Sequence, residues 1–482
     1  MPFNSLAYAL FLPTVFFLYW FVFNKSIKGQ NLFIVLVSYL FYGWWDWRFL
    51  GLIFLVSFFS WGSGLLIERY RHRGHMAKSI YLLNLFFALG VLGVFKYFNF
   101  FMHSLSVLFP GGSSLFPTWK IVLPVGISFY TFQAIGYTVD VYKQKIAPTN
   151  DLIAFLAFVG FFPQLVAGPI ERSTNLLPQF QQKRIFDERS ASDGLRLILW
   201  GLFKKVVVAD TCALYVDSIF NAGQAQPGSA WLMAAILFAF QIYGDFSGYS
   251  DIAIGSARLF GIRLMRNFDL PYTSRSIPEF WRRWHISLTT WFRDYVYIPL
   301  GGNRGSKMKV FRNTLIVFLT SGLWHGANYT FVAWGAYHAF LFIPTILKGK
   351  RPLSTEPITT GRLLPGALEF AKIVLTFLLV TLGWILFRSA SMGQAWDIFC
   401  QLPGKETLSA AYKLFILPET RKATFWVFCM LLLEWIGKSK ECPLLFDRIK
   451  TPLVRYGLYA VFVLLIIYSS QPDSTQFIYF QF

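Results

Sequence analysis

Charged residues are scarce in this sequence: only 14% of its 482 residues are Asp, Glu, Lys or Arg, against about 25% in soluble globular domains. Cysteine and histidine are scarcer, with four and six residues, and they form neither a CxxC nor an HxxxH pattern. We therefore expect no disulfide framework and no metal site. A charged segment followed by a small-residue cleavage site is also missing near the start. Residues 7–23 are therefore interpreted as a retained helix and not as a signal peptide.

Apolar residues dominate the composition instead. The chain is 55% hydrophobic and 20% aromatic, and its mean hydropathy is +0.49. Several apolar runs approach the ~20 residues of a spanning helix, so we predict an all-α polytopic membrane protein with roughly 10–12 membrane segments, some not fully spanning. No internal repeat or separate soluble domain stands out, so residues 1–482 are expected to form one membrane domain. Within it, N-terminal helices cover 1–120, a core covers 121–347 and further helices cover 348–482.

The formal net charge of +20 is distributed unevenly along the chain. Basic residues collect in short loops between apolar runs, most clearly in ERYRHRGHMAK (68–78), as cytoplasmic loops beside anionic lipid do. Positive-inside topology therefore explains the charge, membrane lipid is an expected partner, and water-soluble nucleic-acid binding is excluded. Counting back from this loop, the N-terminus is predicted to lie on the outer side of the membrane.

One histidine falls where a membrane tolerates it poorly. His325 lies between the apolar segments 310–320 and 329–347, and basic residues flank the pair at both outer ends. If both ends face the cytoplasm, the rising arm of about 14 residues climbs only ~20 Å, short of the ~30 Å hydrocarbon core. The turn at His325 should therefore lie within the membrane, where an ionisable side chain is a functional candidate. The alternative is a histidine that donates to a backbone carbonyl and holds a turn.

A second concentration of polar residues falls in 241–251. Asp245 and Tyr249 share one face of a helix there, because residues four apart are neighbours. The clustering predicts that at least part of this segment lines a polar tunnel. The alternative is that each aspartate pairs with Arg282 or Arg283 and joins two helices. The residues assigned to the tunnel lining from these segments are Gln241, Asp245, Ser247, Tyr249, Asp251, Arg282 and Arg283.

The segment 277–304 alternates charged residues with tryptophan and tyrosine. This mixture is typical of a helix that lies in the membrane interface or dips below it. His285 belongs to this segment and directly follows Arg282, Arg283 and Trp284. It is therefore either a functional histidine or one that lies at headgroup level.

These residues permit a chemical hypothesis. A histidine at membrane depth, reached through a polar tunnel, could act as a general base on an incoming hydroxyl that attacks a thioester or ester. The basic cytoplasmic face would attract an anionic donor. No serine or cysteine stands in a recognisable nucleophile motif, so we favour direct or histidine-assisted acyl transfer.

Five ordered sequence blocks cover most of the chain. They are LPVGISFYTFQAIGY (123–137), FFPQLVAGPIER (161–172), YGDFSGYSDIAIGSARLFGI (243–262), FWRRWHISLTTWFRDYVYIPLGGNR (280–304) and LWHGANYTFVAWGAYH (323–338). Together they resemble the membrane-bound O-acyltransferase (MBOAT) family. Within it, the chain looks like the bacterial branch that acetylates alginate, other exported polysaccharides or peptidoglycan.

The resemblance implies a ring of tilted transmembrane and re-entrant helices around a constricted central tunnel. The invariant family histidine falls on His325 and the second family histidine on His285. Trp324 and Asn328, which flank His325 in the same motif, are assigned to the tunnel lining. By resemblance the donor is a cytoplasmic thioester, acetyl-CoA, used as a substrate with no bound cofactor. The expected partner is a periplasmic or extracellular protein of the SGNH-hydrolase type, and the expected location is the bacterial cytoplasmic membrane.

The resemblance thus implies an O-acetyltransferase that moves an acetyl group across the membrane to an exported or cell-wall polysaccharide. One alternative is a transporter or flippase for a lipid-linked sugar, whose path the segment 241–251 and the arginines would line. A simple pore, however, does not need a deep histidine at the WHGAN turn. A second alternative is a D-alanyl transferase for teichoic acid, which would require a carrier-protein donor.

Overall fold

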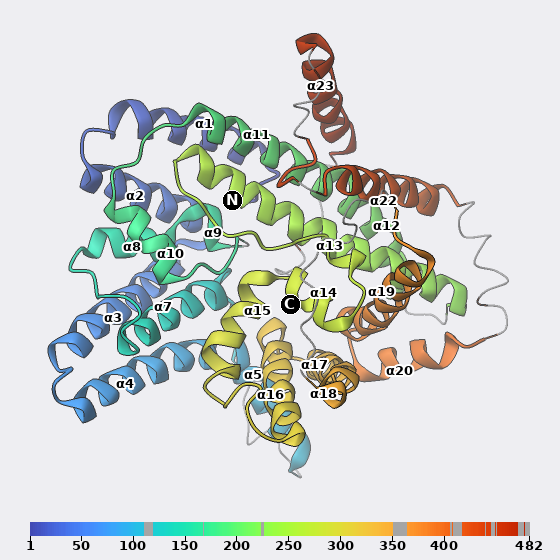
Figure 1. Cartoon of the computed structure of the whole chain (residues 1–482), viewed down its shortest axis with the longest axis horizontal. Helices are drawn as coiled ribbons and strands as arrows, with labels where there is room; N and C mark the ends of the chain where they lie inside the picture. The colour runs from blue at the N-terminus through green and yellow to red at the C-terminus, as the bar shows by residue number, and fades with distance from the viewer. Residues whose placement is uncertain are drawn as a thin grey trace. The chain divides into compact units, whose positions relative to one another are not determined.

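The computed structural model describes most of the chain, and every regular element in the described part is a helix (Figure 1). The chain divides into two compact units, which are treated separately below. Unit 1 holds Met1–Leu195 and Ile252–Met265, and unit 2 holds Arg196–Asp251 and Arg266–Phe482. The described residues are 1–109, 119–166, 168–222, 226–349, 364–404, 407, 417–438, 440–444, 449, 451–470 and 477.

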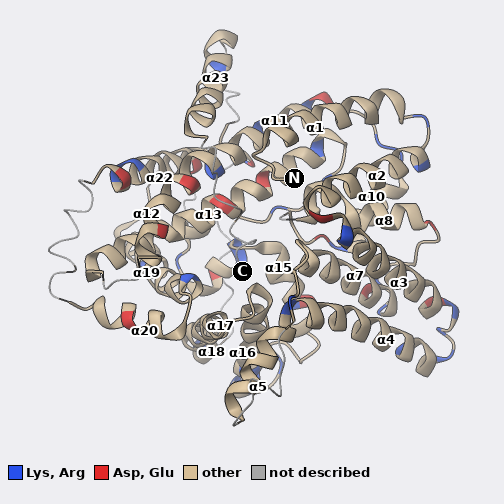
Figure 2. Cartoon of the chain, turned by 180° about the vertical axis from the view of Figure 1, so that it is seen from behind, with Lys and Arg blue, Asp and Glu red and all other residues tan. Residues whose placement is uncertain are grey.

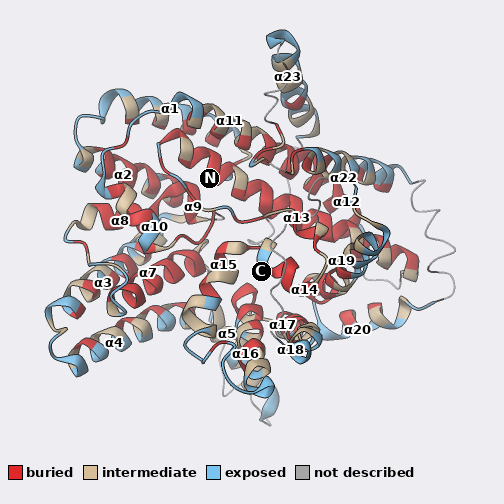
Figure 3. Ribbon diagram, viewed as in Figure 1, coloured by how far each residue is buried: buried red, intermediate tan, exposed pale blue. Residues whose placement is uncertain are grey.

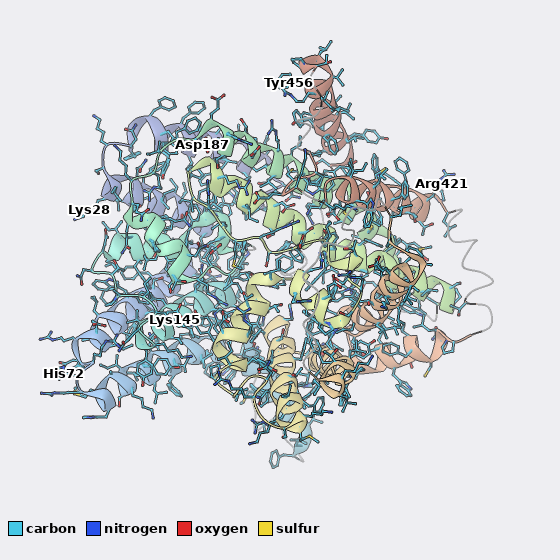
Figure 4. The ribbon with its side chains drawn as sticks, viewed as in Figure 1. Lys28, His72, Lys145, Asp187, Arg421 and Tyr456 are labelled. Carbon is cyan, nitrogen blue, oxygen red and sulfur yellow. The ribbon has the colours of Figure 1, made fainter. Side chains whose placement is uncertain are left out.

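Unit 1 contains the N-terminal helices. They are α1 (Leu6–Phe17), η1 (Leu18–Val22), α2 (Ile27–Asp46), η2 (Trp47–Phe49), α3 (Leu50–Arg69), α4 (Gly74–Leu92), η3 (Gly93–Tyr97), α5 (Phe98–Leu108), α7 (Ile127–Tyr142), α8 (Leu152–Gly160), α9 (Phe162–Leu165), α10 (Ser173–Gln181) and the first half of α11 (Glu188–Leu202). The basic turn between α3 and α4 carries exposed side chains, and Figure 4 shows His72 pointing outward there.

Unit 2 holds the remaining helices. They are η4 (Phe203–Ala209), α12 (Asp210–Phe220), most of α13 (Gly228–Leu259), η5 (Pro271–Thr273), α14 (Ile277–Arg283), α15 (Ile286–Phe292), η6 (Arg293–Tyr297), α16 (Lys307–His325), α17 (Tyr329–Leu341), α18 (Ile343–Lys348), α19 (Ala367–Arg388), α20 (Met392–Gln401), α22 (Pro418–Ile436) and α23 (Pro452–Ser469). Figure 3 shows α13 buried along most of its length and α23 largely exposed.

Six helical stretches in the described part are long and apolar enough to cross a membrane. The protein is therefore a multi-pass membrane protein. Other predicted segments form shorter helices; α7, for example, has 16 residues and starts after Gly126, whose φ is +74°. Most of the segment 348–366 lies outside the described residues. The six stretches are Ile27–Arg69, Gly74–Leu108, Gly228–Leu259, Tyr329–Lys348, Ala367–Arg388 and Pro452–Ser469.

The hairpin predicted around His325 is confirmed. Helix α16 ends at His325, Gly326 takes an extended conformation, and Asn328 accepts a hydrogen bond from the Thr330 backbone N–H at 3.1 Å to cap α17. Glycines let the two helices pack backbone against backbone. A Cβ on Gly322 or Gly335 would come closer than 3.0 Å to a main-chain carbonyl of the facing helix. This close approach fixes the position of the turn that carries His325.

Candidate functional site

A cavity of about 810 Å³ lies within unit 2, and both predicted histidines line it. Its walls come from α14, α15, α16 and α18 together with the turns between them. Most lining side chains are aromatic or aliphatic, among them Trp281, Trp284 and Leu288. A largely apolar cavity with a few polar groups is the usual form of a small-molecule site.

One face of α16 forms a long wall of this cavity. The lining residues recur every three or four positions, as one face of a helix requires. From Lys307 at the start to His325 at the end, the helix rises ~27 Å at about 1.5 Å per residue. The cavity therefore extends along α16 from Lys307 at its start to His325 at its end. The α16 residues on this wall include Lys307, Val310, Thr314, Val317, Ser321 and His325.

The charged side chains among the described lining residues of the cavity are basic. Arg282, Arg293 and Lys307 line it, and none of its described lining residues is Asp or Glu. Lys307 Nζ donates to the Leu347 carbonyl at 2.8 Å, and the exposed Arg293 pairs with its half-buried neighbour Asp294 at 2.8 Å. The side chain of Arg282 is exposed. These cations suit a ligand with an anionic end.

Aromatic rings enclose His325, which is only 4% exposed. Its ring centroid lies 5.0 Å from that of Trp324, 5.1 Å from that of Trp334 and 5.2 Å from that of Phe387. Such rings exclude water from an imidazole, and electrostatic interactions are stronger in a dry site than in solvent. The position of His325 at the end of α16 leaves it on the cavity wall.

His285 reaches the same cavity from the junction of α14 and α15, and it is 1% exposed. Its φ of +43° lies in the left-handed region, which L side chains rarely adopt. The ring packs edge-on against Phe246, with centroids 4.6 Å apart, and lies 5.9 Å from the ring of Trp324. Trp324 therefore contacts both histidines. The structure thus places His285, Trp324 and His325 together, as members of one site.

The aspartates of α13 have partners that the sequence did not suggest. Asp245 pairs with Lys205 at 2.7 Å, and Asp251 pairs with Lys204 at 2.7 Å. The expected alternative, pairing with Arg282 or Arg283, was wrong. The reason is η4, a π-helical turn that directs both consecutive lysines toward α13. Figure 2 shows the acidic positions within α13.

Close packing makes these ion pairs possible. A Cβ on Gly248 would lie 2.7 Å from the Gly201 carbonyl oxygen, so only glycine fits there. Ser247 joins the same cluster, because Lys204 Nζ lies 2.8 Å from its hydroxyl. Two lysines inside the apolar run 195–218 were the signal that could have identified these partners.

The predicted tunnel residues do not all reach the 810 Å³ cavity. Arg282 lines it, whereas the other predicted residues are not among its lining residues: Gln241, Asp245, Ser247, Tyr249, Asp251, Arg283, Trp324 and Asn328. Asp251 instead lines a separate cavity of about 30 Å³ with Lys204, Tyr243 and Glu434. Arg283 Nη2 pairs with Glu279 at 3.0 Å, and Asn328 donates to the Ala390 carbonyl at 3.1 Å.

Three further contacts around the site were not anticipated. Phe477 is 1% exposed, and its ring lies 4.3 Å from that of Tyr249. Trp281, on the cavity wall, donates its indole N–H to Nδ1 of the buried His338 at 3.3 Å. His338 ends the sequence block 323–338 but was given no role there, and no motif in the sequence includes Phe477. Asn267, the third, contacts His285 directly: its Oδ1 lies 3.1 Å from Nδ1 of that ring.

Comparisons with known proteins agree with this picture. A family model described as MBOAT, membrane-bound O-acyltransferase family, matches residues 39–348. A Pseudomonas aeruginosa protein named probable alginate O-acetylase AlgI is 42% identical over 391 residues, covering 81% of this chain and 72% of that protein. A Helicobacter pylori peptidoglycan O-acetyltransferase is 34% identical over 432 residues, covering 83% of this chain and 79% of that protein. A Streptococcus thermophilus teichoic acid D-alanyltransferase is 27% identical over 325 residues, covering 62% and 77% of the two chains.

Proposed function

Because the chain belongs to the membrane-bound O-acyltransferase family, we propose that it moves an acetyl group from acetyl-CoA across the membrane for O-acetylation of an exported or cell-wall polysaccharide. Membership makes the protein an O-acyltransferase. The polysaccharide class is suggested by the names of its relatives, which act on alginate and peptidoglycan. The donor, the direction of transfer and the acceptor are parts of the proposal.

One observation supports the proposal most directly: basic side chains and two histidines line the same cavity. A thioester such as acetyl-CoA has a phosphate-bearing end and a long, mostly uncharged arm that carries the acyl group. Arg282, Arg293 and Lys307 offer positive charge to the phosphates. The apolar wall along α16 suits the arm, and its ~27 Å rise leads to the histidines.

The proposed reaction conserves protons. A cavity imidazole, assigned to His325, takes the proton of an acceptor hydroxyl as the oxygen attacks the thioester carbonyl. The carbon–sulfur bond breaks, and the proton ends on the departing sulfur, so an ester and a thiol are formed. His285 supplies the second imidazole on the wall of this cavity. The enclosing rings of Trp324, Trp334 and Phe387 keep water from hydrolysing the thioester.

The remaining parts of the proposal concern place and partner. The enzyme lies in the bacterial cytoplasmic membrane, with its N-terminus outside and its basic loops on the donor side. A periplasmic or extracellular protein of the SGNH-hydrolase type completes the transfer to the sugar. A D-alanyl donor on a carrier protein is the competing arrangement, and the similarity to the streptococcal D-alanyltransferase is the observation in its favour.

The test is acyl transfer from radiolabelled acetyl-CoA in proteoliposomes that contain wild type or His325→Ala. Wild type should consume the donor, and His325→Ala should lose at least about 10²-fold in rate, the scale of a positioned acid–base group. His72→Ala is the matched control, because this histidine lies exposed in the α3–α4 turn. Equal rates in wild type and His325→Ala would refute the catalytic assignment. Turnover with a carrier-bound D-alanyl thioester but not with acetyl-CoA would refute the donor.

A further inference from the structure

Asn267 holds the turn on which His285 lies. It is 1% exposed, and its side-chain Oδ1 lies within hydrogen-bonding distance of three nitrogen and oxygen atoms of the α14–α15 junction. These are His285 Nδ1 at 3.1 Å, the Ser287 backbone N–H at 3.2 Å and the Ser287 hydroxyl at 2.9 Å. The Asn267 carbonyl accepts a fourth bond, from the Ile286 N–H at 2.9 Å. A left-handed residue persists only where its surroundings over-determine it, and these four bonds do so for His285.

The Ser287 backbone N–H decides which way the Asn267 amide faces. An amide oxygen and nitrogen look alike in shape, so their assignment follows from the hydrogen-bond network. A backbone N–H can only donate, so the atom that faces it must be the oxygen. The same oxygen then faces Nδ1 of His285. The Ser287 hydroxyl also lies 3.4 Å from Nδ1, but it gives its single hydrogen to Asn267 Oδ1 at 2.9 Å and therefore does not donate to the ring. Because an amide oxygen can only accept, Nδ1 must carry a hydrogen.

This assignment fixes the other ring nitrogen. A neutral imidazole carries one hydrogen, so Nε2 of His285 holds the lone pair. Nε2 is buried and has no hydrogen-bond partner in the described part of the chain, and His285 lines the 810 Å³ cavity. The rings around it, Phe246, Phe268 and Trp324, carry no titratable group. The titratable groups on the cavity wall are Arg282, Arg293, Tyr297, Lys307 and His325.

We propose that Asn267 is a positioning residue that locks His285 in the Nδ1–H tautomer, so that Nε2 serves as a proton acceptor in the cavity. Neutral His285 then cannot donate a hydrogen bond to the thioester oxygen through Nε2. The proton released by the acceptor hydroxyl reaches Nε2 directly or through His325, and it leaves on the thiol sulfur. This role rests on the proposed acyl transfer, but the tautomer does not.

The tautomer can be measured by NMR on protein labelled with ¹³C and ¹⁵N histidine in lipid, without donor or turnover. The His285 signals are identified by their loss in His285→Gln. Wild type should show Nδ1–H. Asn267→Leu, which has no acceptor, should lose this preference, and Asn267→Asp, which keeps one, should retain it. Asn313→Leu is the control, because this buried asparagine bonds to the Leu300 and Gly302 carbonyls and not to a histidine.

The kinetic prediction separates positioning from folding. Asn267→Leu should lower kcat at least about tenfold, a part of the 10²–10⁴-fold that a positioned base contributes, with KM for acetyl-CoA within about twofold. Asn267→Asp should recover most of kcat. An Nε2–H tautomer in wild type, or an unchanged tautomer and kcat in Asn267→Leu, would overturn the proposal. If wild type showed the expected tautomer but transferred no acetyl group, the result would contradict the proposed function and not the proposed tautomer.

Discussion

The close contact between α16 and α17 gives the most direct test of how the fold holds His325. Gly335 of α17 faces the Phe318 carbonyl of α16, and a Cβ at this position would come closer than 3.0 Å to that oxygen. Real Cβ atoms essentially never lie so close, and the obstacle is backbone, which cannot rotate away. Gly335→Ala must therefore push the two helices apart. To reach ordinary van der Waals contact, they must separate locally by about 1 Å.

Both stability and activity should respond to this displacement. Over-packing a tight contact costs typically about 1–3 kcal/mol. His325 ends α16 two turns beyond Phe318, so its ring should shift relative to the cavity, and a misplacement of ~1 Å can cost about 10²-fold in rate. We therefore expect the rate of acetyl transfer to fall by between tenfold and a hundredfold. Each tenfold fall corresponds to an activation free energy that is higher by ~1.4 kcal/mol. The assays are acetyl transfer in proteoliposomes and retention of folded protein after heating.

Gly457 provides the matched control. It lies in the interior of α23, and a Cβ there would meet nothing within 4 Å. Gly457→Ala should therefore leave activity unchanged and should stabilise the helix by up to about 1 kcal/mol, the difference in helix propensity. If Gly335→Ala matched wild type in both rate and heat resistance, the tight hairpin would not be what positions His325.

Three further predictions concern charged side chains. Lys205→Met should destabilise the protein by about 3–5 kcal/mol, because it removes the cation that the carboxylates of Asp245 and Asp210 share at 2.7 Å and 2.9 Å. Adding Asp245→Asn should recover part of the folded yield in detergent, and no recovery would contradict the pairing. Burial raises the pKa of Glu171 from 4.5 to about 7, so the folded state holds an extra proton between these values. The free energy of unfolding should therefore fall as the pH rises from 4.5 to about 7, and Glu171→Gln should remove this slope in melting experiments. Arg282→Glu should raise KM for acetyl-CoA by about tenfold at low salt and less at high salt, because rim charges are screened; a KM independent of salt would exclude this role.

The hairpin around His325 could be predicted because its signals are local. Apolar runs mark the two helices, basic residues mark their outer ends, and Gly326 and Asn328 mark the turn between them. Each of these acts within a few residues of its own position in the chain. The depth of His325 in the membrane stays a prediction, because α16 has 19 residues and rises ~27 Å, more than the ~20 Å expected for the arm. The structure shows that His325 is buried among aromatic rings of the protein.

The partners of the polar residues in α13 could not be predicted in the same way. Asp245 and Lys205 are 40 residues apart in the chain. Their pairing depends on a π-helical turn and on close glycine contacts, and no local sequence pattern indicates either of these. Arg282 and Arg283 looked equally suitable by charge. Charge complementarity limits the set of partners, but only backbone packing selects one of them.

His285 shows why this distinction matters for chemistry. The sequence identifies the residue, yet an imidazole can present either a donor or an acceptor to a substrate, and these serve opposite roles in acyl transfer. The choice is made by Asn267, 18 residues earlier in the chain, whose own orientation is fixed by the Ser287 backbone N–H. Neither residue contributes a charge or a recognisable catalytic pattern. In the proposed reaction the role of His285 is therefore determined by a neutral hydrogen-bond network, and such a network can be found only where the backbone brings its members together.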